Sequence, residues 1–78
     1  MLEFKKAEDD GNAATLEYYP EGKGEPGIVT IDRSVGTVSV LSASPNDRHE
    51  RYAERMFAEA RRMLSDDGVR DDGTAFWY

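Results

Sequence analysis

Residues 45–65 read PNDRHERYAERMFAEARRMLS, and this stretch decides the fold. Its apolar side chains recur three and four positions apart, the spacing that gathers them on one face of an α-helix. This apolar face consists of Tyr52, Ala53, Met56, Phe57, Ala60, Met63 and Leu64. Ser44 is a favoured capping residue, Pro45 suits the first helical position, and Asp47 is favoured near the positive helix end. We therefore predict one long helix over residues 45–65, with Gly68 as its stop.

The segments before this helix alternate in the manner of β-strands. Leu2 and Phe4 alternate with charged neighbours in a first strand, and residues 7–12 are expected to turn at an Asp-Gly pair. Residues 13–19 predict a second strand, on which Leu16 and Tyr18 share one face. A loop should follow over residues 20–27, because they are too rich in glycine and proline for a regular element.

The clearest hairpin joins residues 28–31 to residues 38–41, and both segments are rich in β-branched side chains. Asp32 is suited to open the turn between them, and Gly36 to take a positive φ. The side chains expected to point toward the helix are Val29, Ile31, Val38 and Val40.

The chain ends in Ala-Phe-Trp-Tyr at residues 75–78. Three consecutive aromatic rings are costly to leave in water, since each offers ~150–250 Å² of surface to bury. We therefore predict a short fifth strand at this end, running antiparallel beside the first strand.

These elements predict a single α+β domain over residues 1–78. Its architecture would be a four- or five-stranded antiparallel β-meander with one long α-helix packed on one face. A chain of 78 residues buries only ~60–65% of the surface that its unfolded form exposes, so the core is thin. With no cysteine to form a disulfide, stability must come from packing or from a partner.

Composition narrows the classes of function. A formal net charge of −6 argues against a general nucleic-acid binder, because such binding depends on neutralising phosphates. No apolar run approaches the ~20 residues of a membrane span, and the first residues lack a signal-peptide pattern. The absence of cysteine fits a reducing compartment. We predict a soluble cytoplasmic protein with no cofactor, and neither the single histidine nor the acidic pairs follow a metal-binding pattern.

His49 falls near the middle of the apolar arc when the helix is drawn at about 100° per residue. It could be an acid–base or metal residue in a half-buried site. A metal needs further ligands, however, and acid–base catalysis needs a nucleophile or a substrate pocket, neither of which the sequence offers. We interpret His49 as a packed residue at the edge of the core, and we predict no catalytic residue and no enzyme.

A basic stripe lies on one flank of the apolar arc, formed by Arg48, Arg51, Arg55 and Arg62. It could contact phosphate, nucleic acid or an acidic partner. The plainer interpretation is a solvated helix face, which the four-residue spacing of Arg55 and Glu59 favours. The stripe is nevertheless the best candidate for a charged contact surface.

Aromatic side chains supply another candidate surface. Tyr18 and Tyr19 must point to opposite faces of a strand, and alternation likewise separates Trp77 from its neighbours. Because one helix covers only one face, Tyr19 and Trp77 could form a homodimer or partner surface on the other face, where such residues are enriched. They could equally be cross-strand pairs that stabilise a small sheet.

The chain also resembles a group of small, acidic, uncharacterised bacterial proteins that share a domain of unknown function. The resemblance covers nearly the whole chain and rests on residues 17–22 (EYYPEG), 26–27 (PG), 32–36, 46–47 (ND), 52–53 (YA) and 77–78 (WY). These motifs are structural rather than chemical, so the resemblance implies no activity and no binding residue.

Two hypotheses for function follow. The first is a non-enzymatic protein-interaction module whose partner is another protein or a second copy, because the core is small and the aromatic surface is large. The alternative is an acidic inhibitor or nucleic-acid mimic that competes for a basic site, which the charge of −6 suggests.

Overall fold

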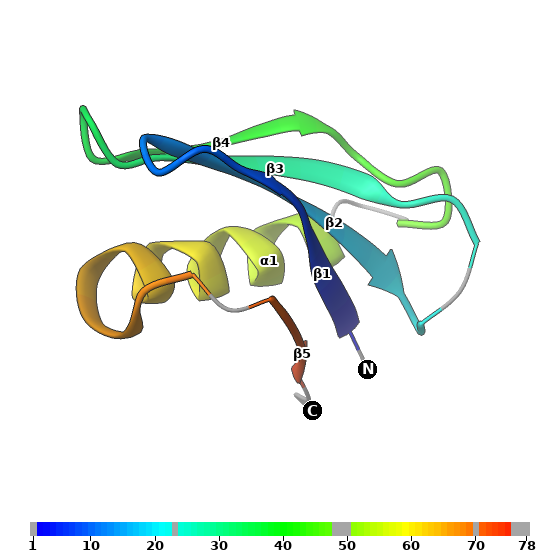
Figure 1. Ribbon diagram of the computed structural model, residues 1–78. Helices are drawn as coiled ribbons and strands as arrows, with labels where there is room; N and C mark the ends of the chain where they lie inside the picture. Colours follow the sequence, from blue (N-terminus) through cyan, green and yellow to red (C-terminus); the bar gives the residue numbers. More distant parts are fainter. Residues whose placement is uncertain (1, 23, 48–50, 70, 76–78) are drawn as a thin grey trace.

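The computed structural model describes residues 2–22, 24–47, 51–69 and 71–75. This part of the chain forms two layers, a twisted sheet and a helix that crosses one of its faces (Figure 1). The elements in chain order are β1 (Leu2–Asp9), β2 (Ala13–Pro20), β3 (Gly27–Asp32), β4 (Thr37–Ser42), α1 (Arg51–Arg62) and β5 (Asp72–Ala75). A π-helical turn, Met63–Asp67, extends α1.

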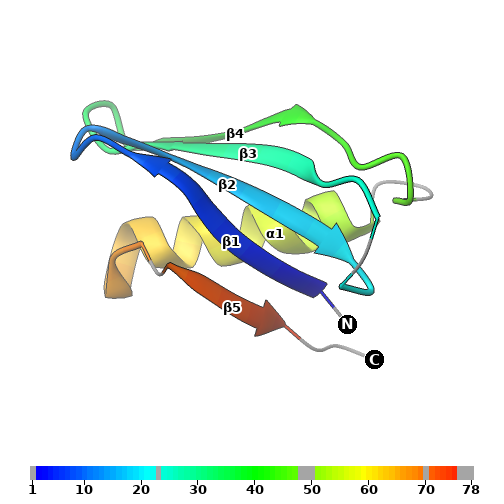
Figure 2. The same ribbon diagram turned by 45° about the vertical axis from the view of Figure 1, so that its right-hand side comes forward.

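The strands are ordered β4-β3-β2-β1-β5, and every neighbouring pair is antiparallel. The predicted α+β class and the meander are therefore confirmed. After α1 the chain returns to the starting edge, and β5 lies antiparallel beside β1 (Figure 2). This fifth strand begins at Asp72, earlier than the predicted start at residue 75, and Phe76, Trp77 and Tyr78 lie outside the described residues.

Alternation along the strands builds the core. In β2 and β3 every second residue is buried, and these residues face α1 as predicted. The buried apolar residues of both layers are Leu2, Phe4, Leu16, Tyr18, Val29, Ile31, Val38, Ala53, Met56, Ala60 and Met63. Tyr52, Phe57 and Leu64 complete the predicted apolar helix face but are only half-buried at its borders.

Val40 departs from the prediction, because 39% of it stays exposed. Here α1 packs against β2, β3 and β4, and the last of these is the terminal strand. The inner face of β4 is therefore only partly covered.

Two glycines sit opposite core aromatic residues. Gly27 of β3 pairs with Tyr18, and Gly73 of β5 pairs with Phe4. A Cβ atom at Gly73 would lie 2.6 Å from the Phe4 ring, and one at Gly27 would overlap the Tyr18 ring. Each ring thus occupies the space that a side chain on the neighbouring strand would need.

The two predicted turns differ in outcome. β1 continues to Asp9, so the expected turn over residues 7–12 is shorter, with a register shift between Lys6 and Glu8. The turn between β3 and β4 matches its prediction. Asp32 Oδ1 accepts hydrogen bonds from the amide and hydroxyl of Ser34, at 3.0 and 2.6 Å, and Gly36 has a φ of +74°.

The start of the helix was predicted wrongly. Pro45 and Asn46 form a turn, and the described part of α1 begins at Arg51. Asp47, not Ser44, bonds to amides near the start of the described part of α1: its carboxylate accepts hydrogen bonds from the amides of Tyr52 and Ala53, at 2.9 and 2.8 Å. Ser44 Oγ instead donates to the Glu25 carbonyl at 2.6 Å.

Asp47 also joins the helix to the sheet. It is buried, and its Oδ2 accepts a hydrogen bond from the Tyr18 hydroxyl at 3.1 Å. The same hydroxyl accepts one from the Ser44 amide at 3.0 Å. One carboxylate therefore both bonds to amides of α1 and accepts a hydrogen bond from a core tyrosine of the sheet. Gly68 ends the helical segment as predicted, with a φ of +77° and its amide donating to the Met63 carbonyl.

Candidate functional site

Two arginines of the predicted basic stripe form ion pairs with one buried glutamate. Glu59 is buried, and its Oε1 lies 3.3 Å from Arg55 Nη2 and 3.9 Å from Arg62 Nη1. Arg51 is exposed, while Arg48 and His49 lie outside the described residues. The structure thus brings Arg55 and Arg62 together around Glu59, which accounts for their clustering without a ligand.

The face of the sheet away from α1 is mainly polar. Tyr19 lies on this face as predicted, half-buried, with its hydroxyl donating to Glu17 Oε1 at 3.2 Å. The Lys5 ammonium lies 5.7 Å from the centre of its ring. Other cross-strand pairs on this face join charged or hydroxyl side chains, as in Lys5–Glu17 and Thr15–Thr30. The second predicted aromatic contact, Trp77, lies outside the described residues.

A different surface stands out at the β4 edge. β4 is the terminal strand of the described sheet, and its sequence, TVSVLS, holds neither a charged residue nor a proline. Such an edge presents a row of backbone donors and acceptors that can pair with another strand. It also exposes apolar side chains, because Leu41 is 65% exposed and Val40 is 39% exposed.

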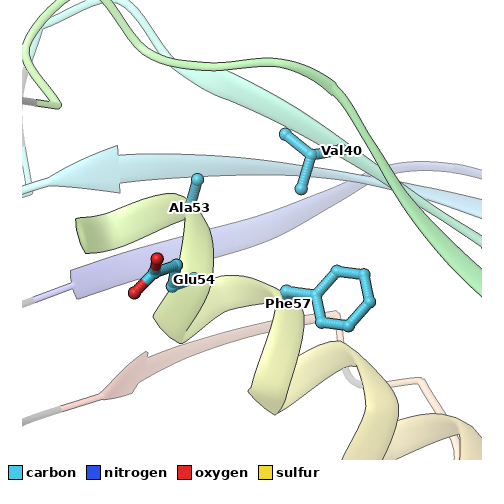
Figure 3. Close-up of a pocket in the computed structure, with 4 residues that line it drawn as sticks. All are labelled: Val40, Ala53, Glu54 and Phe57. Atoms are coloured by element: carbon cyan, nitrogen blue, oxygen red, sulfur yellow. The ribbon is translucent and has the colours of Figure 1, made fainter. Parts of the chain in front are cut away.

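An open groove follows the inner side of this edge, between β4 and α1. It has a volume of about 250 Å³ and is lined by Val40, Ala53, Glu54 and Phe57. Figure 3 places Val40 above the helix, opposite Ala53 and Phe57, with the Glu54 carboxylate on the rim. The β4 edge and this groove together can take an extended segment whose backbone pairs with β4 and whose apolar side chain enters the groove.

Glu54 and Phe57 line the groove, and Arg61 lies one turn further along the same flank of α1. At about 100° per residue, Glu54, Phe57 and Arg61 fall within an arc of roughly 60°. The Arg61 guanidinium lies 5.8 Å from the centre of the Phe57 ring. This flank therefore carries an acidic group, a ring and a basic group in sequence, and we call it the β4-side flank.

A second hollow lies beside the loop after β2, with a volume of about 390 Å³. Its lining residues are Pro20, Glu21, Gly24, Asn46 and Tyr52. The Tyr52 hydroxyl donates to Glu21 Oε2 at 2.7 Å, and this carboxylate raises the pKa of the phenol. This hydrogen bond ties the helix to the loop after β2.

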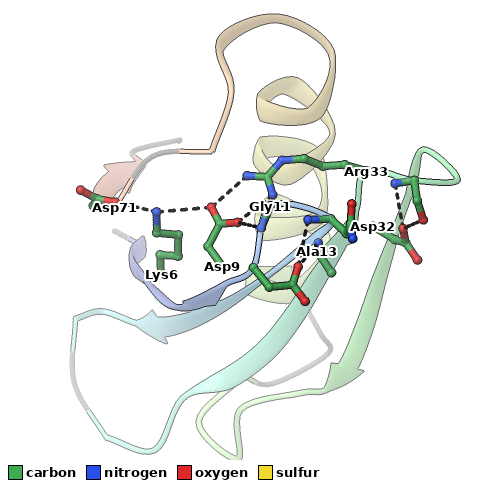
Figure 4. A network of polar contacts seen from close by, with 10 residues as sticks. Lys6, Asp9, Gly11, Ala13, Asp32, Arg33 and Asp71 are labelled. Atoms are coloured by element: carbon green, nitrogen blue, oxygen red, sulfur yellow. Dashed lines mark hydrogen bonds and ion pairs between the residues drawn. The ribbon is translucent and has the colours of Figure 1, made fainter.

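A polar network links the end of β1 to the β3–β4 turn and to the segment before β5 (Figure 4). Arg33 donates to both carboxylate oxygens of Asp9, at 2.8 and 3.0 Å, and holds the pKa of this carboxyl well below its usual range. Lys6 Nζ lies 2.8 Å from Asp71 Oδ1, and this contact raises the pKa of the lysine. These acids connect β1, the β3–β4 turn and the segment before β5.

The groove was missed by reasoning from sequence. Its signals were present, because Val40 and Leu41 end the last strand of a meander and Phe57 lies at the border of the apolar arc. Which strand becomes an edge, and how far the helix reaches across the sheet, are properties of the assembled layers. The periodicity of apolar residues along one segment predicts neither of these properties.

The comparisons with protein-family models, curated proteins and solved structures gave no match. Among the described residues, no group of three or more His, Cys, Asp or Glu side chains is placed to hold a metal ion. Within the same residues, no helix is long and apolar enough to cross a membrane.

Proposed function

We propose that this chain is a small protein-interaction module, and not an enzyme, which binds its partner along the β4 edge. The observation that carries the proposal is the coincidence of an uncharged terminal strand with an apolar groove on its inner side. In strand addition, backbone hydrogen bonds supply affinity, and pockets for alternate side chains supply specificity. The β4 edge and its groove offer both parts. We place the module in the cytoplasm as part of the same proposal.

The acidic-mimic hypothesis has less support. A mimic needs carboxylates ranked on one face and open to a basic partner. In the described part of the chain several acids already serve local contacts. Asp9 pairs with Arg33, Asp47 caps α1, and Glu59 holds two arginines.

Selection of phage-displayed random peptides on the immobilised protein tests the proposed function. We expect peptides that alternate apolar and polar residues, since alternate side chains of an added strand point into the groove. Val40→Lys should weaken their binding by at least ~10-fold, because an inward-pointing charge on an edge strand opposes strand addition.

Val35→Lys is the matched control. Val35 is 69% exposed in the β3–β4 turn, away from the groove, so the same change there should leave peptide binding within ~2-fold of wild type. Thermal unfolding of both variants checks that they fold. Peptides that bind Val40→Lys as tightly as Val35→Lys would rule out the β4 edge as the contact surface.

A further inference from the structure

We infer that the partner at the β4 edge is a second copy of this chain, held by a two-fold axis through the groove. This inference rests on the proposed function and names the occupant of the same surface. Two β4 strands would pair antiparallel, joining the sheets of the two copies. Glu54 of each copy would then meet Arg61 of the other.

The symmetry follows from the fold. Antiparallel pairing of identical edge strands places the two-fold axis normal to the sheet, so both helices lie on the same face. The axis also makes the two helices antiparallel to each other. Since α1 packs on the β4 side of its own sheet, each β4-side flank faces the other copy.

The groove fixes where the helices meet. Val40 and Phe57 line the same groove, so an axis that passes near Val40 in the strand pair passes near Phe57 in the helix pair. In antiparallel helices related by an axis that passes between residues 57 and 58, the position three residues before Phe57 lies opposite the position four residues after it in the partner. On this chain those positions hold Glu54 and Arg61.

The charges complement each other only in this arrangement. Antiparallel helices give two symmetry-related Glu54–Arg61 contacts, whereas parallel helices would place Glu54 beside Glu54 and Arg61 beside Arg61. Within one copy the two residues are two turns apart, about 10.5 Å along the axis, and cannot pair. Among the described residues neither of them forms an ion pair. The β4-side flank is therefore complementary to itself.

Sedimentation equilibrium of the full chain tests the inference. We expect the mass to rise with concentration toward twice the 8.8 kDa of one chain. Glu54→Arg and Arg61→Glu should each raise the dimer Kd by roughly 100-fold, because each removes two symmetry-related contacts worth about tenfold apiece. The double variant Glu54→Arg/Arg61→Glu should return the Kd to within ~3-fold of wild type.

The valine variants separate this inference from the proposed function. Val40→Lys should be monomeric and Val35→Lys should match wild type, with circular dichroism confirming that each folds. A wild-type chain that stays monomeric at high micromolar concentration overturns the inference, and if it still selects peptides at β4 the proposed function stands. A dimer that Val40→Lys leaves intact, or that the double swap does not restore, also overturns the two-fold pairing.

Discussion

The β5 edge of the sheet carries charge, and the β4 edge does not. At the first, Asp72 lies within a four-residue strand, and Asp71 just before it pairs with Lys6 of β1. At the second, six uncharged residues run beside an apolar groove. Short, charged edge strands oppose pairing with other chains, whereas an uncharged edge invites it. The same small sheet is thus charged at one edge and uncharged at the other, and this contrast supports our proposal that association occurs at β4.

The largest expected effect comes from removing the support of α1, which forms one wall of the groove. Asp47→Ala should lower the free energy of unfolding by about 3 kcal/mol, because it removes a helix cap and the buried acceptor of the Tyr18 hydroxyl. Asp47→Asn keeps one acceptor oxygen and should cost about half as much. Urea titration followed by circular dichroism measures both changes.

Asp72→Ala is the matched control on the β5 edge. Asp72 is exposed, so its loss should change stability by less than about 0.5 kcal/mol. Equal losses at the two positions would show that Asp47 does not hold the helix to the sheet.

An intermediate effect is expected from weakening the packing of β5, the charged edge strand. Gly73→Ala should cost about 1–2 kcal/mol, because the new Cβ would meet the Phe4 ring at 2.6 Å. Since β5 is an edge strand, we expect the strain to loosen β5 from β1 before it disturbs the rest. Hydrogen exchange should then show lost amide protection in β1 and β5 alone. Thr74→Ala, an exposed change in the same strand, should preserve protection, and a uniform loss with Gly73→Ala would contradict this prediction.

The smallest effect is a dependence on pH at the charged end of the sheet. Arg33 lowers the pKa of Asp9 below the ~3.9 of an unfolded chain, so the folded state binds fewer protons in acid. The stability from this pair is therefore present above about pH 4 and is lost as pH falls through the folded pKa. Asp9→Asn should lower the melting temperature by at most about 5 °C at pH 7 and flatten its decline below pH 4. A variant whose melting temperature falls as steeply in acid as wild type would exclude Asp9 as a source of this slope.

Much of the fold could be predicted because its signals are local. The apolar spacing from Tyr52 to Leu64 defines a helix face, and the Asp32 to Gly36 turn carries its own chemistry. The start of the helix failed because Ser44 and Asp47 are both good caps, and the choice depends on Tyr18, a residue distant in sequence. Whether a side chain of the candidate surfaces is exposed depends on which elements pack over it, and the spacing of residues along one segment does not show this. For that reason Val40 was expected to be buried against the helix.

The buried bond between Tyr18 and Asp47 has a consequence for how the chain folds. A first helical turn is costly to form alone, and here its amides need a carboxylate that the β2 hydroxyl holds in place across 29 residues of sequence. We therefore expect the helix to form together with the sheet rather than before it. We expect a fragment that begins after β2 to form little helix, because it lacks the Tyr18 hydroxyl that holds the Asp47 carboxylate in place.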